Sequence, residues 1–126
     1  AATLNPDDMK ALGLYFSRQT PKLGTAKDAE LARSGQKLFR GGDAAAGIPA
    51  CAGCHSPDGS GIPKTYPRLA GQWPDYIHAQ LKAFHMGDRG ADKDGRDANG
   101  KVMAAIAFKM NDEQMRAVAE YLAGLH

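Results

Sequence analysis

The chain has 126 residues with 15 Gly and 7 Pro but only 4 Phe, 4 Tyr and 1 Trp, so it suits one compact domain that is poor in bulky core side chains. Its formal net charge of +2 excludes the strongly basic balance of a nucleic-acid-binding protein. No apolar stretch approaches the roughly 20 residues of a transmembrane helix, and two cysteines three positions apart exclude a loop-closing disulfide framework.

Two helices are expected in the first third of the chain. Residues 6–19 follow an Asn5 cap, start with a proline and place apolar side chains at helical spacing. Residues 28–40 form the second expected helix, which a pair of glycines ends. Gly35 inside this helix costs about 1 kcal/mol relative to alanine, which indicates close contact with another element.

Loops and helices alternate in the rest of the chain. Residues 44–71 are rich in glycine, proline and small residues, and residues 88–101 are a polar loop whose charges cancel. Helices are expected at 74–86 and, after a short helical turn at 102–108, from the Asn111 cap almost to the end of the chain. No segment alternates apolar and polar residues as a strand does, so the predicted fold class is all-α.

One short motif, Cys51-Ala52-Gly53-Cys54-His55, indicates the chemistry. In a C-x-x-C-H pattern the two thiols lie one turn apart and can add to the two vinyl groups of a haem as thioethers, and the following histidine is placed to ligate the iron. The small residues between the cysteines let the backbone lie close to the macrocycle. The motif predicts one covalent haem c, which would also supply apolar bulk to the core.

Two other uses of a C-x-x-C pair are less well supported. A thioredoxin-like dithiol expects a preceding strand and a βαβ setting, which the sequence does not show. A structural zinc site needs four ligands, and beyond this motif the chain has only lone histidines at positions 78, 85 and 126. We therefore expect haem attachment.

The iron of a low-spin electron carrier needs a second axial ligand, and a methionine sulfur favours the ferrous state. Met103 follows the polar loop and begins a short turn, so its side chain could close over the haem face opposite His55. Met86 at a helix end and Met110 before the Asn111 cap are the remaining methionine alternatives. Met9 and Met115 have positions typical of core packing. Bis-histidine ligation through His78 or His85 is a further alternative, although charged neighbours predict that both are solvated.

Four further sequence blocks surround the haem motif: Leu38-Phe39-Arg40-Gly41-Gly42, Ile48-Pro49-Ala50-Cys51, Tyr66-Pro67-Arg68-Leu69-Ala70-Gly71-Gln72 and Gln80-Leu81-Lys82-Ala83-Phe84. With these blocks the chain resembles a class I c-type cytochrome over about residues 28–125, and more narrowly the C-terminal-like half of the di-haem cytochrome c4 family. The resemblance implies the class I cytochrome c fold, in which Gly35 and Phe39 of an N-terminal helix cross Tyr121 of the C-terminal helix.

The resemblance also implies roles for residues outside the haem motif. In the family a proline carbonyl accepts a hydrogen bond from the ring of the haem histidine and so fixes its tautomer, and Pro67 stands at that place. Arg68 is expected to approach a haem propionate. Met103, ahead of the Ile-Ala stretch at 104–107, occupies the place of the distal methionine.

The same resemblance divides the chain into two parts. Residues 1–24, a helix and a linker, resemble the end of a preceding cytochrome domain, and residues 25–126 form the cytochrome c domain. Because one C-x-x-C-H motif is present, the chain is either part of a two-haem protein or a one-haem relative with an extra N-terminal helix.

The expected function is that of a single-electron carrier, not an enzyme, between respiratory redox proteins such as a membrane cytochrome oxidase or reductase. We expect no nucleic acid and no small-molecule substrate; a second haem domain or a second copy is a further candidate partner. A haem enzyme or gas sensor with a displaceable sixth ligand, and an electron-delivery module of a larger dehydrogenase complex, are the alternatives. The start Ala1-Ala2-Thr3 is typical of an exported, mature protein, so we expect a periplasmic protein that is soluble or peripherally membrane-associated.

Overall fold

The computed structural model of the chain describes residues 2–91, 94 and 96–126. In these residues the secondary structure is helical, without strands, in the following order: α1 (Pro6–Ser17), α2 (Ala29–Gly41), α3 (Ala52–His55), α4 (Pro74–Met86), α5 (Ala98–Ala107) and α6 (Asp112–Ala123). The predicted all-α fold class is thus confirmed. Within the described ranges, no helix combines the length and the apolar character that crossing a membrane requires.

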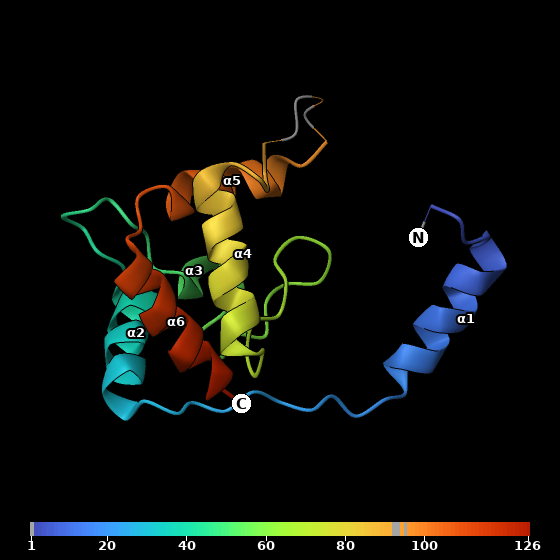
Figure 1. Cartoon of the computed structure of the whole chain (residues 1–126), viewed down its shortest axis with the longest axis horizontal. Helices are drawn as coiled ribbons and strands as arrows, with labels where there is room; N and C mark the ends of the chain where they lie inside the picture. The colour runs from blue at the N-terminus through green and yellow to red at the C-terminus, as the bar shows by residue number, and fades with distance from the viewer. Residues whose placement is uncertain (1, 92–93, 95) are drawn as a thin grey trace.

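The core forms where α2 crosses α6, the most extensive helix contact in the molecule (Figure 1). Gly35 lies so close to α6 that a Cβ atom there would overlap the Ala117 carbonyl. Beside this contact the Phe39 and Tyr121 rings lie 5.5 Å apart, inclined at 52°. Phe39 is fully buried. The close contact predicted for Gly35 and the helix crossing implied by the family resemblance are therefore both present.

Helix α4 packs against both α5 and α6. His78 Nε2 lies 2.7 Å from Asp112 Oδ1, and Arg116 Nε donates to Asp112 Oδ2 over 2.8 Å. These hydrogen bonds, the one from Arg116 first, lower the pKa of Asp112 to about 2. His85 donates from Nδ1 to the Ala107 carbonyl over 2.8 Å. The prediction that both histidines are simply solvated is wrong, because each joins α4 to a neighbouring element.

Two helices differ from the sequence-based expectation. Helix α5 begins at Ala98 rather than within a turn starting at 102, because the Asp97 carboxylate accepts a hydrogen bond from Gly100 N over 2.7 Å and caps it. The short helix α3 lies inside the stretch that was expected to be loop. By contrast, α4 has the predicted bounds, and α6 begins with the predicted capping box between Asn111 and Gln114.

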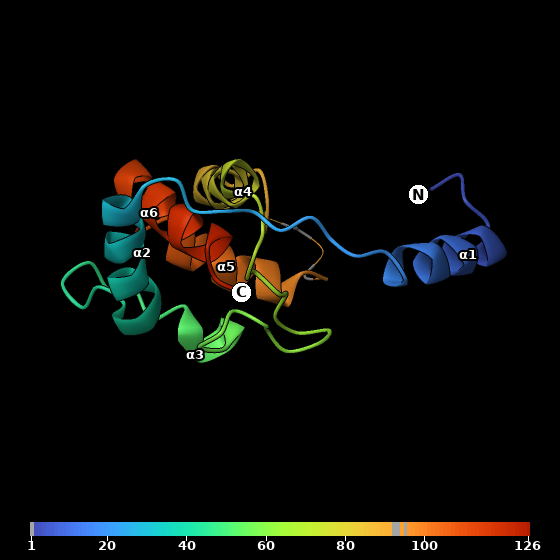
Figure 2. The same cartoon turned by 90° about the horizontal axis from the view of Figure 1, so that it is seen from below.

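Helix α1 stands apart from the other five helices (Figures 1 and 2) and contacts none of them. All its residues are exposed, including Met9 at 48% and Phe16 at 66%, so the prediction of a core position for Met9 is not met here. The segment after α1 returns to the body of the molecule, where Gly24 N donates to Gly71 O over 2.6 Å. The buried Glu120 carboxylate then accepts hydrogen bonds from the backbone N–H groups just before α2.

Candidate haem site

The cysteine motif forms the single turn of α3. The N–H groups of Cys54 and His55 donate to the Cys51 carbonyl over 3.2 and 2.9 Å, which places the two cysteines at the two ends of one turn. Both thiols are free and partly exposed. Burial raises the pKa of the Cys51 thiol to about 11. A redox-active dithiol needs a thiolate and therefore a lowered pKa, so the structure disfavours the thioredoxin-like interpretation.

The imidazole of His55 is buried and oriented by the loop that follows it. Its Nδ1 lies 3.0 Å from the Pro67 carbonyl oxygen, and only 5% of the residue is exposed. A carbonyl oxygen can only accept, so Nδ1 carries the proton and Nε2 carries the lone pair that a metal ion would take. The hydrogen bond that the resemblance implies for Pro67 is present in the structure.

Loop residues beside His55 hold this arrangement in place. Gly61 N donates to the His55 carbonyl over 2.9 Å, and Gly61 has a φ of +71°. A Cβ atom at Gly61 would lie 2.6 Å from the Pro67 carbonyl carbon, so only glycine fits this crossing. The Tyr66 ring meets the His55 ring edge-on at 6.1 Å. Tyr66 was not predicted to have a role; its place next to Pro67 in the sequence was the available signal.

The five methionines of the chain are in clearly different environments. Met110 and Met115 are 3% and 2% exposed and belong to the hydrophobic core. Met86 is 69% exposed at the end of α4. Met103, in the middle of α5, is half-buried and packs against the same core cluster as Cys51. The assignment of Met103 as the iron ligand stays a prediction.

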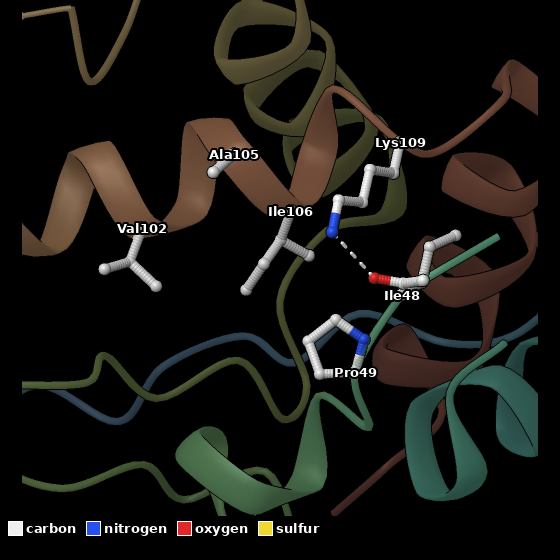
Figure 3. Close-up of a pocket in the computed structure, with 7 residues that line it drawn as sticks. Ile48, Pro49, Val102, Ala105, Ile106 and Lys109 are labelled. Carbon is white, nitrogen blue, oxygen red and sulfur yellow. Dashed lines mark hydrogen bonds between the residues drawn. The ribbon is translucent and has the colours of Figure 1, made fainter. Parts of the chain in front are cut away.

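An apolar cleft of about 580 Å³ separates α5 from the segment that leads into α3. Figure 3 shows Val102 and Ile106 projecting from α5 to the side on which Ile48 and Pro49 lie. Only Ala50 separates Ile48 and Pro49 from the haem motif. Val102 directly precedes Met103, and Ile106 follows it by three residues. No role was predicted from the sequence for these lining residues.

Arg68 lies on the surface of the loop after His55. Near it, the hydroxyl and backbone N–H of Ser60 lower the pKa of Asp58, and the positive charge of Arg68 contributes to this shift. The propionate contact predicted for Arg68 stays a prediction. No group of three or more His, Cys, Asp or Glu residues that could hold a metal ion occurs in the part of the chain that the structure describes.

The donor set fits a covalent haem. Two free thiols on one turn are placed to form thioethers, and an oriented imidazole with a protonated Nδ1 is the usual proximal ligand. The apolar cleft next to the segment that leads into the motif suits the macrocycle. These residues meet the chemical requirements of a c-type haem site.

Comparison with known proteins gives concordant results. A profile of the cytochrome c family matches residues 32–126. The chain is 42% identical over 120 residues to cytochrome c4 of Azotobacter vinelandii, which covers 94% of this chain and 54% of that protein. It is 37% identical over 125 residues to the thiosulfate dehydrogenase electron acceptor of Thiomonas intermedia (strain K12), covering 98% of this chain and 55% of that protein. The chain thus spans about half the length of these curated relatives.

A solved structure agrees with the sequence comparison. The crystal structure of reduced recombinant cytochrome c4 from Pseudomonas stutzeri has a TM-score of 0.82 to this structure at 37% sequence identity. The match covers 98% of this chain and 62% of that chain. The resemblance to cytochrome c4 noted in the sequence is therefore confirmed.

Proposed function

This chain belongs to the cytochrome c family, and from that premise we propose that it is a one-electron carrier with His55 and Met103 as the two axial ligands of its haem. Membership of the family, together with the Cys51 and Cys54 pair, implies one covalent haem c. When bound, the haem supplies the iron that takes up and releases one electron.

The chain's own residues have separate tasks in this proposal. Cys51 and Cys54 attach the cofactor, and His55 Nε2 ligates the iron while Pro67 fixes the ring orientation. Met103 supplies a soft sulfur ligand that favours the ferrous state. Arg68 is proposed to place its positive charge near a propionate. With both axial positions held by protein side chains, no substrate needs to bind to the iron.

The observation that carries the proposal is the hydrogen bond from His55 Nδ1 to the Pro67 carbonyl. It selects the tautomer in which Nε2 is available, and it is made by a histidine that directly follows two free cysteines. A buried histidine in a purely structural role would not need to follow two cysteines directly in the sequence.

We propose further that residues 1–24 close a preceding cytochrome unit. Helices α1 and α6 share four residues at matching positions, in the pairs Asn5 and Asn111, Met9 and Met115, Ala11 and Ala117, Tyr15 and Tyr121. Both asparagines cap their helix through the same bond, from the N–H three residues on, over 2.8 Å. In α6, Met115 and Ala117 are buried and Tyr121 is half-buried, whereas the matching residues of α1 are all exposed. A second C-x-x-C-H motif upstream in the parent reading frame is the expected finding.

The partners are proposed to be redox proteins at a membrane, such as a cytochrome oxidase or reductase, and the proposed location is the periplasm. The similarity to cytochrome c4 proteins supports both proposals. One relative is named as the electron acceptor of a thiosulfate dehydrogenase, which supports a dehydrogenase as an alternative electron donor.

The direct test of the cofactor is a pyridine haemochrome spectrum after expression with a cytochrome c maturation system. Covalent haem should remain on the wild-type chain after denaturation and extraction. Cys51→Ser and Cys54→Ser should each leave one vinyl group unsaturated, and the extended conjugation should move the haemochrome band to longer wavelength. Ser60→Ala, in the loop after the motif, should keep the wild-type spectrum. A wild-type chain from which all haem can be extracted would contradict the proposal.

A further inference from the structure

A lysine side chain reaches across the mouth of the apolar cleft. Lys109 follows α5, and its Nζ donates a hydrogen bond over 3.0 Å to the carbonyl of Gly47, on the opposite side of the cleft (Figure 3). The aliphatic part of the side chain also lies over Gly47, because a Cβ atom there would be 3.9 Å from Lys109 Cδ. One hydrogen bond therefore joins the end of α5 to the segment four residues ahead of Cys51.

The acceptor of this hydrogen bond sits on a fixed turn. Asp43 and Ile48 exchange two backbone hydrogen bonds of 2.8 and 2.9 Å around the turn that contains Gly47. Gln114 of α6 donates to Asp43 Oδ2 over 3.1 Å. The Gly47 carbonyl is thus held in place from the core side, and Lys109 is the residue that binds α5 to it.

A second side-chain hydrogen bond joins the other end of α5 to the His55 side of the site. Asn99 Nδ2 donates to the Thr65 carbonyl over 3.2 Å. Thr65 precedes Tyr66, which contacts His55 and is paired with Ile62 through two backbone hydrogen bonds of 2.8 Å. Asn99 and Lys109 lie on either side of Met103 in the sequence.

We propose that Lys109 and Asn99 are positioning residues that hold α5, and with it the Met103 sulfur, against the wall of the site that carries Cys51 and His55. This inference rests on the proposed function, since it takes Met103 as an axial ligand. Helix α5 is also held to the body of the molecule by its packing against α4 and by the hydrogen bond from His85 to the Ala107 carbonyl, but these contacts do not reach the haem motif. Without the hydrogen bonds of Lys109 and Asn99, α5 retains that packing but moves away from the haem motif more often.

This movement has a measurable consequence. An external ligand such as imidazole enters the sixth position only in the fraction of molecules in which Met103 has left the iron. Its apparent dissociation constant is therefore the intrinsic constant divided by that fraction. A variant that weakens the contact between α5 and the Gly47 turn should raise the fraction of molecules in which Met103 is off the iron, and so tighten imidazole binding. Without imidazole, Met103 should remain the ligand in most molecules.

The test is imidazole titration of the ferric, haem-loaded chain at pH 8, where imidazole is largely neutral. Lys109→Met should keep the iron–sulfur charge-transfer band without imidazole and should lower the apparent dissociation constant for imidazole about three- to tenfold, the effect of losing one exposed hydrogen bond. Asn99→Ala should act in the same direction. Lys109→Arg, which can still reach the Gly47 carbonyl, should restore the wild-type value within about twofold.

The matched control is Lys101→Met, which removes the same charge from α5 itself, whereas Lys109 stands just after that helix. The Lys101 side chain is exposed and makes no hydrogen bond or ion pair within the described part of the chain. The apparent dissociation constant of Lys101→Met for imidazole should match that of the wild type. A wild-type charge-transfer band combined with unchanged imidazole affinity in Lys109→Met would overturn this inference alone. Absence of the band in the wild type would instead overturn the proposed axial ligand, and this inference with it.

Discussion

Met103→Ala is expected to abolish the iron–sulfur charge-transfer band of the ferric protein and to lower its reduction potential. The band requires a sulfur on the iron, and alanine has none. The potential falls because a thioether stabilises ferrous iron, and axial ligands move haem potentials over a range of roughly 0.8 V. Optical spectroscopy and potentiometric titration measure the two effects. Covalent haem should be retained, since Cys51 and Cys54 are unchanged.

Two methionine variants control for this result. Met86→Ala removes a side chain that is 69% exposed, so neither the band nor the stability should change. Met110→Ala removes a side chain that is only 3% exposed and should cost about 2–5 kcal/mol of unfolding free energy while the band persists. Loss of the band in Met110→Ala, with retention in Met103→Ala, would move the ligand assignment to Met110.

Gly35→Ala is expected to destabilise the fold by about 3 kcal/mol, at the upper end of overpacking effects. The added methyl group would overlap the Ala117 carbonyl and lie 2.9 Å from Val118 N, and these are backbone atoms of α6 that a rotamer change cannot move. Helices α2 and α6 must therefore separate, which also disturbs the Phe39 and Tyr121 contact. Urea unfolding followed by far-UV circular dichroism measures the loss.

The matched control lies in the same helix. Gly41 has no atom within 4 Å of its added Cβ position, so Gly41→Ala gains helix propensity without a clash. It should stabilise the protein by about 0.5 kcal/mol. If the two variants had equal unfolding free energies, the close approach of α2 and α6 at Gly35 would not limit stability.

Several residues of the site could be identified from the sequence without knowledge of the fold. The covalent attachment depends on spacing within five consecutive residues, so Cys51, Cys54 and His55 could be identified from the sequence. Gly35 was identified because glycine is costly inside a helix unless another element approaches. Met103 could be ranked first from the sequence, and the structure adds that its alternative Met110 is part of the core.

Other features could not be predicted from local patterns. The Asp97 cap that starts α5 early lies in a polar loop where many residues could cap a helix. The contacts of His78 with Asp112 and of Lys109 with Gly47 join residues 34 and 62 positions apart. A lysine or histidine among charged neighbours looks solvated unless the partner element is known. The exposure of Met9 was missed because helical spacing identifies an apolar face but not whether another element covers it.

The sequence by itself determined the helical class, the attachment of one haem and the histidine that follows the two cysteines, because each depends on short-range spacing along the backbone. Only the tertiary structure decided how Pro67 and Tyr66 orient His55, which methionines the core buries, and which side chains join α5 to the segments beside the haem motif. These features depend on the crossing of α2 and α6 and on the loop that returns beneath His55, and such contacts between distant segments form only when the chain is folded.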